Sequence, residues 1–474
     1  MGIIQTIKNE LKAAIGYQQS FDELLTAGDV TRAVAMLDSR SEAASRNLLD
    51  YEVGSHKVME REDRAVYDKK GNFLRWSKRN KIPIPYQKYI NEISLVFLYG
   101  RPVKWTQLSK STDDAFSTYI ELMRQVRFDS AVRQAKRAAG AEGCAAILYH
   151  VYRDENNTPQ LLLNVLSKKN NDDIYTLKDQ YGQLKAFAWG YYLTEQGNRT
   201  IHHIDVYTAN TIYLCKRGNI GWEVQAMLNP IGKIPVLLFE QETEHADVQP
   251  MIEREENMES VDADVNDRFA NPAMVATAEI LNSLPKSEEE AKLFILKNGG
   301  DVRYLTWDQA SESKKNQFER LDKHILSKSF TPNIDFDNMK SLGNLSAKAI
   351  RKVMLLAVIK AERHKENHDG YMNRHASLMK AILGNVLDYR HKAMYEALEL
   401  GHEFQEPFGD DVSEMLADLS KQYNDGALSL ESYVEKSYLV KDSKSEMERI
   451  KTEQAERLAQ QMELNKMDVF GEAE

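Results

Sequence analysis

The sequence has few cysteines and no long apolar run. Its 474 residues include only Cys144 and Cys215, far apart and without CxxC spacing. This excludes a disulfide framework or a zinc ribbon and indicates a reducing compartment. The longest apolar run, Val353 to Ile359, is too short to cross a bilayer, and the N-terminus lacks a signal-peptide pattern. We therefore expect no membrane role and synthesis in the cytoplasm.

Positive charge is also in short supply. There are 62 basic and 72 acidic side chains, which gives a net charge of −10. Because affinity for nucleic acid comes largely from neutralising phosphates, this balance excludes a protein that simply coats DNA. Any contact with DNA must be local or weak. The composition, 42% hydrophobic and 28% charged, is otherwise that of a globular chain long enough for more than one core.

Catalytic motifs are missing. The sequence has no phosphate-binding P-loop, no nucleophile elbow and no zinc-deaminase signature. His364 and His368 have the i, i+4 spacing of a metal site, but Glu366 does not complete an HExxH order. We expect these two and His375 to be surface or interface histidines, and we expect no enzyme, no catalytic residue, no cofactor and no metal.

The first residues allow two interpretations. Met1 to Thr6 matches a myristoylation pattern that would place an acyl chain on Gly2. Apolar residues at positions 3, 4, 7, 11 and 15 instead follow helical spacing. We favour an amphipathic first helix.

Two regions of different character follow. Residues 1 to about 140 are predicted to be mostly helical, with a polar loop around Arg61 to Asn72. From Cys144 to Phe239, runs rich in β-branched and aromatic residues alternate with turn clusters such as Asn156-Asn157. This pattern predicts an antiparallel sheet region.

A long acidic helix is predicted from Asp247 to Phe269. The segment has no glycine, and its length corresponds to roughly 35 Å at 1.5 Å per residue. Nine acids and two bases lie between Asp247 and Glu279. Taken alone, this balance favours a solvated outer face over a channel lined by carboxylates.

A compact inserted module and a second helix come next. Helix-breaking residues punctuate the module: Pro272, Pro285 and Gly299-Gly300. It ends in the strand-like Val302–Leu305. The second helix is predicted from Asn316 to Phe330, because Pro332 disfavours helical geometry at Thr331 and removes a donor. Residues Asn333–Asn344 are then a loop.

Residues 314 to 352 reverse the charge balance. They carry nine bases and four acids. We expect most of these bases to pair with the acidic helix of the same or a neighbouring subunit. Lys340 is the exception, because it lies in the predicted loop.

A third, long helix is predicted to begin at Ser346, whose hydroxyl can cap the first-turn amides. Apolar residues recur at intervals of three and four from Ile350 to Val386, so this helix is expected to approach forty residues. The last seventy residues are predicted to form short helices, with Gly426 stopping one and Ser429 capping the next.

Four stretches occur in an informative order. They are Asn80-Lys81-Ile82-Pro83 with Tyr99-Gly100-Arg101-Pro102-Val103, then Gly232-Lys233-Ile234-Pro235-Val236, then Val302 through Thr331-Pro332-Asn333 to Leu345-Ser346-Ala347-Lys348-Ala349, and finally Asp442 to Glu453. This ordered set, covering residues 80 to 460, resembles the portal proteins of long-tailed bacteriophages, the head–tail connector subunits. That family often has glycine after the serine, where this chain has Ala347.

The resemblance implies an α+β, mainly helical portal fold. Its parts would be a wing (1–240, helical then β-rich), a first stem helix (241–281), a clip (282–315), a second stem helix (316–332), a tunnel loop (333–345), a long wing helix (346–400), and a helical crown with the C-terminal tail (401–474).

The same resemblance implies a function. Portal subunits form a closed ring, twelvefold in the capsid, at one capsid vertex, and DNA is packaged and ejected through it. The implied partners are other copies of the chain, double-stranded DNA, the terminase large subunit that supplies the missing ATPase, the major capsid and scaffolding proteins, and a head-completion or adaptor protein. The implied location is the virion, with assembly in the host cytoplasm.

Site residues follow from that architecture. The resemblance places DNA-channel residues in the tunnel loop (Asp335, Asp337, Asn338, Lys340 and Asn344) and on the stem (Glu255, Glu259, Asp262 and Lys323), and docking residues in the clip (Lys286, Glu288 and Glu289). Negative walls suit a duplex that must slide, because lysines would each trap a phosphate.

Two other classes of function remain open on the residues alone. The acids at 253, 255, 256 and 259 could hold a divalent ion in a metal-dependent nuclease, although no basic or nucleophilic partner accompanies them. A non-viral oligomeric scaffold is the third interpretation.

Overall fold

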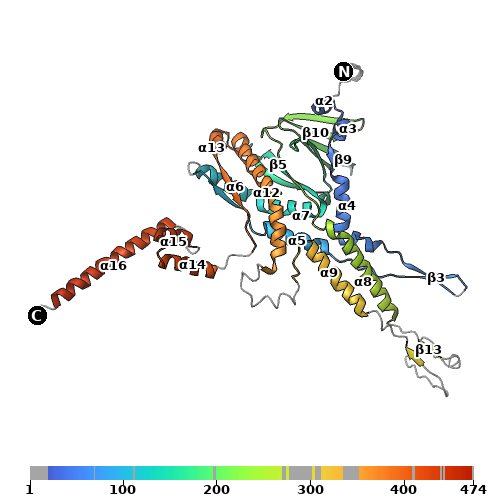
Figure 1. The fold of residues 1–474 in the computed structure, drawn as a ribbon. Helices are drawn as coiled ribbons and strands as arrows, with labels where there is room; N and C mark the ends of the chain where they lie inside the picture. The colour runs from blue at the N-terminus through green and yellow to red at the C-terminus, as the bar shows by residue number, and fades with distance from the viewer. Residues whose placement is uncertain are drawn as a thin grey trace. The chain divides into compact units, whose positions relative to one another are not determined.

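The computed structural model describes residues 20–68, 70–109, 113–195, 199–269, 274–276, 302–304, 311–334, 352–407, 412–437, 440 and 443–471. Helices and antiparallel strands are mixed along the chain (Figure 1), as the sequence predicted. The chain divides into two compact units, residues 1–335 with 354–407 and residues 336–353 with 408–474. In the described part of the chain, no helix is both long and apolar enough to cross a membrane. The predicted first helix at residues 1–15 lies outside the described residues.

The first unit contains a six-stranded antiparallel sheet ordered β1-β7-β8-β9-β10-β11. Its strands are β1 (Asp38–Ser39), β7 (Asp173–Lys178), β8 (Leu184–Glu195), β9 (Arg199–Tyr207), β10 (Thr211–Arg217) and β11 (Trp222–Leu228). Helices α2 (Phe21–Thr26) and α3 (Val30–Ala35) pack on it, and Leu25 and Val30 share a buried cluster with Val206 and Cys215. Ser20 caps α2 through a capping box with Glu23.

A three-stranded antiparallel sheet, β12-β5-β6, carries the largest core. Its strands are β5 (Cys144–Arg153), β6 (Pro159–Leu166) and β12 (Val236–Glu240). The predicted antiparallel region from Cys144 to Phe239 is therefore confirmed. Three helices contribute to the core: α5 (Tyr86–Tyr99), α7 (Phe128–Glu142) and α12 (Leu355–Ile382). We call this sheet, the six-stranded sheet and these helices the body.

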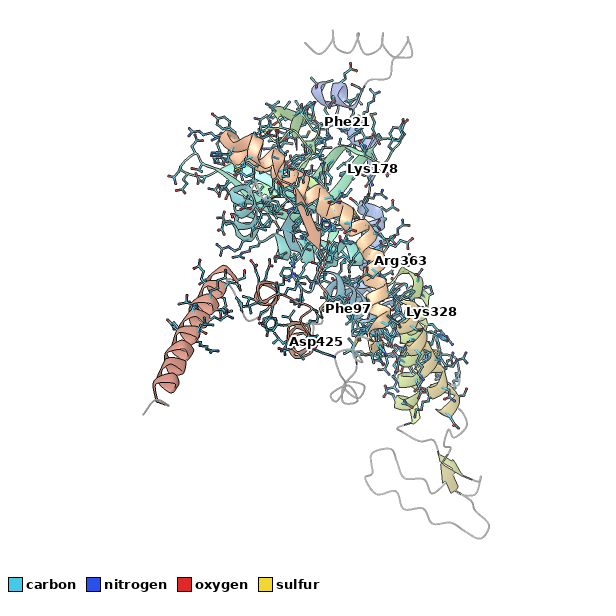
Figure 2. All side chains as sticks on the ribbon, turned by 60° about the vertical axis from the view of Figure 1, so that its left-hand side comes forward. Phe21, Phe97, Lys178, Lys328, Arg363 and Asp425 are labelled. Carbon is cyan, nitrogen blue, oxygen red and sulfur yellow. The ribbon has the colours of Figure 1, made fainter. Side chains whose placement is uncertain are left out.

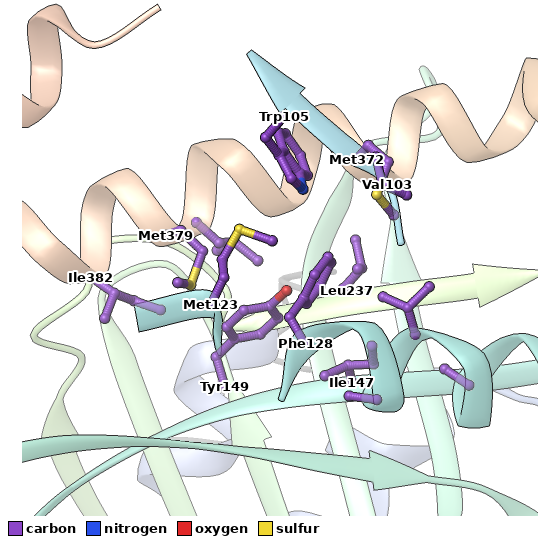
Figure 3. Packing of buried hydrophobic residues seen from close by; sticks show 14 of the residues in the cluster. Val103, Trp105, Met123, Phe128, Ile147, Tyr149, Leu237, Met372, Met379 and Ile382 are labelled. Carbon is purple, nitrogen blue, oxygen red and sulfur yellow. The ribbon is translucent and has the colours of Figure 1, made fainter. Parts of the chain in front are cut away.

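Figure 3 shows how this core is filled. Phe128 of α7 and Tyr149 of β5 lie opposite Met379 and Ile382 of α12, and all four are buried. Burial of this kind contributes roughly 1.5–3 kcal/mol per large apolar side chain. Other helical elements of this unit are α4 (Ser41–Tyr51), α6 (Asp113–Gln125) and the short 3₁₀ turns Val53–Ser55, Lys57–Glu60 and Lys168–Asn170.

The long helix α12 ends before residue 400, the end of the range that the resemblance implied. α12 ends at Ile382 and continues as one π-helical turn, Leu383–Leu387, in which Asp388 N–H donates to Leu383 O at 2.8 Å. The range 346–400 is therefore wrong at its C-terminal end. A 3₁₀ turn (Tyr389–His391), α13 (Lys392–Ala397) and β15 (Leu400–Glu403) follow, and β15 pairs with β4 (Lys104–Gln107). No local sequence pattern indicates β15, because its partner strand lies nearly 300 residues earlier in the chain. The predicted start at Ser346 lies outside the described residues.

The predicted polar loop at Arg61 to Asn72 is wrong, because this segment begins a β-hairpin. Strands β2 (Arg64–Tyr67) and β3 (Phe73–Ser77) pair antiparallel with a bulge between Val66 and Tyr67. The turn is built by Asp68, whose carboxylate accepts from the Lys70 and Asn72 amides at 2.8 Å, and by Gly71 at φ +85°. We call residues 64–77 the arm; its strand β3 is labelled in Figure 1.

Helices α8 (Gln249–Phe269) and α9 (Ser311–Lys328) lie side by side (Figure 1) and form the paired helices. α8 follows a 3₁₀ turn at Ala246–Val248 and matches the predicted acidic helix closely. α9 begins five residues before the predicted Asn316, inside the range assigned to the clip. The sequence Ser311–Lys315 contains no helix-breaking residue, so nothing local delays the helix.

Pro332 is not what ends α9. Phe330 adopts a left-handed conformation at φ 56°, and the Thr331 N–H donates to Leu326 O at 2.8 Å. This bond and the left-handed residue are the features of a Schellman motif, in which phenylalanine here takes the position usually held by glycine. The helix therefore stops two residues before the proline can act.

Between the paired helices, the described residues form a short antiparallel ladder of β13 (Met274–Ala276) and β14 (Val302–Tyr304). This matches the strand predicted at the end of the inserted module. The rest of that module lies outside the described residues.

The second unit, as described, contains α14 (Val412–Asn424), α15 (Leu430–Lys436) and α16 (Ser443–Gly471). Gly426 at φ +74° follows α14, and the Ser429 hydroxyl accepts from the Ser432 amide, so both predicted helix signals are confirmed. The prediction that all these helices are short is wrong, because α16 has 29 residues.

Candidate functional site at the paired helices

The paired helices rest on a small apolar base. Four fully buried residues form this base: Val248 in the turn before α8, Ile252 near the start of α8, Ile325 of α9 and Ile90 of α5. Lys314, early in α9, pairs with Asp262, late in α8, so the two helices are antiparallel. This base fixes the start of α8 and the end of α9 to the body.

Glu255, which the resemblance placed on the channel face, does not lie on an open face of α8. It is 5% exposed, and Tyr86 Oη lies 3.0 Å from its Oε1 and 2.9 Å from Asp322 Oδ1. Burial raises the pKa of Glu255 to about 7, and the Asp322 charge adds to the effect while the Tyr86 bond opposes it. Because a hydroxyl donates only one proton, the three groups are best satisfied when Glu255 is protonated.

Most other α8 carboxylates are bonded to residues 56–84. Glu256 is 1% exposed, lies 2.6 Å from His56 Nδ1 and accepts from the Ile84 amide at 2.7 Å. Asp264 accepts from the Arg61 guanidinium at 2.9 Å and from the Asn80 amide at 2.7 Å. Asp267, next along this face, accepts from the Asn80 side chain at 2.6 Å. No local sequence pattern indicates these partners, because they lie about 200 residues away from α8 along the chain.

The remaining predicted stem residues are only partly covered. Asp262 Oδ1 lies 2.5 Å from Lys314 Nζ, which agrees with the expected pairing of the acidic helix and the basic segment. Glu259 is half-buried and Lys323 is exposed. The structure thus separates Glu255 from the group and leaves Glu259, Asp262 and Lys323 as predicted channel residues.

A buried charge cluster joins the segment just before α8 to α7 and α12. Glu244, two residues before the 3₁₀ turn Ala246–Val248 that leads into α8, is 8% exposed and lies against two lysines and a histidine. Its carboxylate pairs with Lys136 of α7, with Lys360 of α12 at 2.7 Å and with His364 Nε2 at 3.1 Å. Burial alone would raise the pKa of Glu244, but the Lys136 charge, the His364 hydrogen bond and the Lys360 charge hold it well below its usual range.

The same cluster reaches the end of α9. Lys360 Nζ also donates to Ser329 O at 3.1 Å, just before the left-handed Phe330. A cavity of about 310 Å³ opens beside it and is lined by Lys328 and Arg363, both labelled in Figure 2. The arrangement ties the loop-side end of α9 to the long helix α12.

Two of the three α12 histidines expected at a surface or interface, His368 and His375, lie in the core, so the expectation is wrong for these two. His368 and His375 are 1% and 0% exposed, and their Nδ1 atoms lie 2.7 Å from the hydroxyls of Tyr99 and Tyr149. His375 also stacks on Phe128 with ring centroids 3.6 Å apart. Burial lowers the pKa of both histidines well below its ordinary value, so they are neutral core residues. Across the described parts of the chain, no three His, Cys, Asp or Glu side chains are grouped to hold a metal ion.

Two sets of predicted residues lie outside the described part of the chain. These are the tunnel-loop residues Asp335, Asp337, Asn338, Lys340 and Asn344, and the clip residues Lys286, Glu288 and Glu289. The residues that lead from α9 into the loop segment are described as far as Ile334, whose amide donates to Tyr89 Oη at 3.0 Å.

Comparison by sequence gives the class of protein. Residues 41–460, most of the chain, match the sequence profile of phage portal proteins, which are structural proteins of a capsid vertex. The chain therefore belongs to the family described as phage portal protein, SPP1 Gp6-like. The resemblance found in the four ordered stretches is confirmed. No curated protein matches the chain by sequence.

Comparison with solved structures finds chains of gene transfer agent (GTA) particles. A chain in the neck of the native particle, computed with C12 symmetry, is 11% identical, with a TM-score of 0.41, covering 73% of this chain and 87% of that one. A chain in the neck of the empty particle, computed with C6 symmetry, is 9% identical, with a TM-score of 0.38 and coverages of 76% and 88%. A chain in the virion of the native particle is 11% identical, with a TM-score of 0.35 and coverages of 73% and 86%.

Proposed function

We propose that this portal protein forms a closed homo-oligomeric ring, twelvefold in the capsid, through which double-stranded DNA is packaged and ejected. The observation that carries the proposal is the family match over residues 41–460, which includes the body, the paired helices and α12. Cyclic closure suits identical subunits that contact each other through different faces.

The parts of the fold take the following roles in this proposal. The body is the wing, α8 and α9 are the two stem helices, and α12 is the long wing helix that meets them. Residues 282–310 are the clip, shortened because α9 begins at Ser311. Residues 335–345 are the core of the tunnel loop, and α14 to α16 belong to the crown and tail.

The contacts of α8 support a channel that attracts DNA weakly. Six of its seven carboxylates accept hydrogen bonds or ion pairs from the same chain, Lys57 holding Glu253 at 3.2 Å. Each such bond offsets part of the negative charge of α8. The channel face that we propose carries both signs of charge, because it contains Glu259, Asp262 and Lys323. A mixed face neither traps phosphates nor strongly repels them.

Partner docking is assigned to the ends of the stem. We propose that the clip, with Lys286, Glu288 and Glu289, binds the terminase large subunit during packaging and a head-completion protein afterwards. The body would face the major capsid and scaffolding proteins. Assembly would take place in the host cytoplasm and end in the virion.

The burial of the α8 carboxylates disfavours the nuclease alternative. Glu255 and Glu256 are 5% and 1% exposed and already bonded to Tyr86, His56 and the Ile84 amide. A divalent cation takes six or more oxygens in an open geometry. Both side chains are buried and each has an oxygen bonded within the chain, so neither presents an open carboxylate to an incoming ion.

Ring formation is tested by negative-stain imaging of the purified chain together with light scattering. We expect rings with a central hole, and a stable 54.3 kDa species at micromolar concentration would contradict the proposal. Magnesium-dependent nicking of DNA by that species would instead support the enzyme.

The tunnel loop is tested by charge reversal. Changing both Asp335 and Asp337 to lysine should slow packaging severely while rings still form, because every subunit would add phosphate-binding groups to one narrow collar. Lys340→Ala should have a milder effect on packaging rate or DNA retention. Normal packaging by the double-lysine variant would show that this loop does not meet DNA.

A further inference from the structure

Among the described residues, the arm exposes an aromatic face. Tyr67, Phe73 and Trp76 are 60%, 50% and 62% exposed. The ring centroids of Tyr67 and Phe73 lie 6.2 Å apart, and those of Phe73 and Trp76 lie 5.4 Å apart. The bulge between Val66 and Tyr67 allows this alignment, because it shifts the alternation of side chains along the hairpin.

The opposite face of the arm is basic. Arg64 pairs with Ser77 and Val66 with Arg75, one register position away from the Ala65–Trp76 pair, so these residues lie on the other face. Residues 64–77 contain four basic side chains and one acid, whereas the whole chain carries −10, so all other residues together carry −13. The arm is thus complementary in charge to the rest of the molecule.

The arm is held firmly at its root. Arg61 and Asn80, on either side of it, both bond Asp264 of α8, and the Ile82 amide donates to Ser260 at 2.9 Å. The Asp63 carboxylate accepts from the Arg79 amide at 3.2 Å and closes the base of the hairpin. A two-stranded hairpin is marginal in water on its own. Its direction is therefore fixed by the stem while its aromatic face is left without packing.

We propose that the arm packs its aromatic face on a neighbouring copy of this chain in the ring. This inference rests on the proposed ring and names one of the surfaces that closes it. The root of the arm is bonded to the same residues of α8 in every subunit. In a ring, every arm therefore meets the same element of the next subunit. Apolar burial supplies the affinity, and the +3 arm against the −13 remainder selects a copy of the chain as the partner.

Duplex DNA fits this face less well. A basic hairpin could contact phosphates, but stacked base pairs offer no surface to a cluster of three rings and Leu74, which is 59% exposed. Base–aromatic stacking requires unstacked, single-stranded bases. The aromatic face therefore favours a protein surface.

The test compares two double variants of the full chain. Phe73→Ser with Trp76→Ser should raise the concentration for half-assembly, followed by sedimentation velocity, by roughly tenfold or more, because exposed aromatics that become buried dominate interface affinity. The matched control is Tyr181→Ser with Ile220→Ser, which removes two turn residues that are 80% and 104% exposed. We expect the control to assemble like the wild type, and circular dichroism to be unchanged in both.

Each outcome decides the proposal. If the wild type assembles and the Phe73/Trp76 variant assembles equally well, the arm surface is overturned and the ring is not. The same conclusion follows if the Tyr181/Ile220 control loses as much assembly as the Phe73/Trp76 variant. A wild-type chain that stays monomeric would overturn the ring and the arm surface together. Loss of binding to a labelled 30-base-pair duplex without loss of assembly would replace the neighbour with DNA.

A crosslink identifies the partner directly. Benzoylphenylalanine in place of Trp76, in rings mixed from ¹⁴N and ¹⁵N chains, should yield peptides that join the two isotopes. Adducts confined to one isotope would overturn the proposal.

Discussion

In the body, α7, α12 and β5 bury Phe128, Tyr149 and Met379 in one large apolar core, where the tyrosine hydroxyl meets the neutral His375. Along α8, the buried side chains include Glu255 and Glu256, and only a few apolar residues surround them. The body is thus stabilised mainly by apolar burial, which does not depend on direction. The paired helices depend on directed bonds between acids and residues 56–86, which orient them but contribute less net free energy.

This difference teaches that orientation and stability are supplied by different parts of the chain. A helix pair held by specific polar contacts can loosen without unfolding the body, since local opening follows local burial. In a portal protein, such a design would let the paired helices adjust while the body stays rigid. The two regions meet at Glu244, whose carboxylate bonds α7 and α12 just before α8 begins.

Removing that meeting point should have the largest effect. Glu244→Ala leaves Lys136 and Lys360 buried without their anion, and the pKa of Lys136 is already lowered by burial. We expect the free energy of unfolding to fall by about 3–5 kcal/mol, measured by urea denaturation of the unassembled chain. The exposed neighbour variant Glu242→Ala should change it by less than ~0.5 kcal/mol. A loss below ~1 kcal/mol for Glu244→Ala would mean that the cluster is not a structural joint.

A matched pair of smaller cuts separates the two regions. Ile325→Val at the base of the paired helices and Ile382→Val in the body should each cost about 0.5–1.5 kcal/mol. In hydrogen exchange, Ile325→Val should speed exchange in α8 and α9 while β5 amides stay protected. Ile382→Val should instead lower protection in β5. Equal changes across both regions in either variant would show that they unfold as one unit.

The smallest effect should depend on pH. The pKa of Glu255 is raised to about 7 by burial, above its ordinary 4.5, so the folded state holds a proton that the unfolded state releases. That contribution is fully present below about pH 4.5 and is lost as the pH rises through 7. Glu255→Gln keeps a neutral group there, so it should match the wild type at pH 4.5 and exceed it by up to ~1 kcal/mol at pH 8. Glu259→Gln, at the half-buried neighbour, is the control. A Glu255→Gln advantage that grows toward low pH would show that the carboxylate is ionised in the folded protein.

Several features could be predicted from the sequence because their causes are local. The strands between Cys144 and Phe239 follow from β-branched and aromatic runs broken by turn residues, and α8 follows from an unbroken stretch without glycine. Gly426 and Ser429 mark helix ends through their own backbone and hydroxyl chemistry. The ordered stretches from residue 80 to 460 were enough to indicate the portal family.

Only the tertiary structure decided which polar groups are buried and what they contact. Glu255 looked like an exposed acid on a polar helix face, yet Tyr86, from 169 residues earlier, covers it. His368 and His375 looked like surface histidines, yet the sheet and α5 enclose them. A helical pattern shows which residues share a face, but burial depends on which distant segment packs against that face. The sequence therefore determined the elements and the family of this protein, while folding decided the environment of its charged groups.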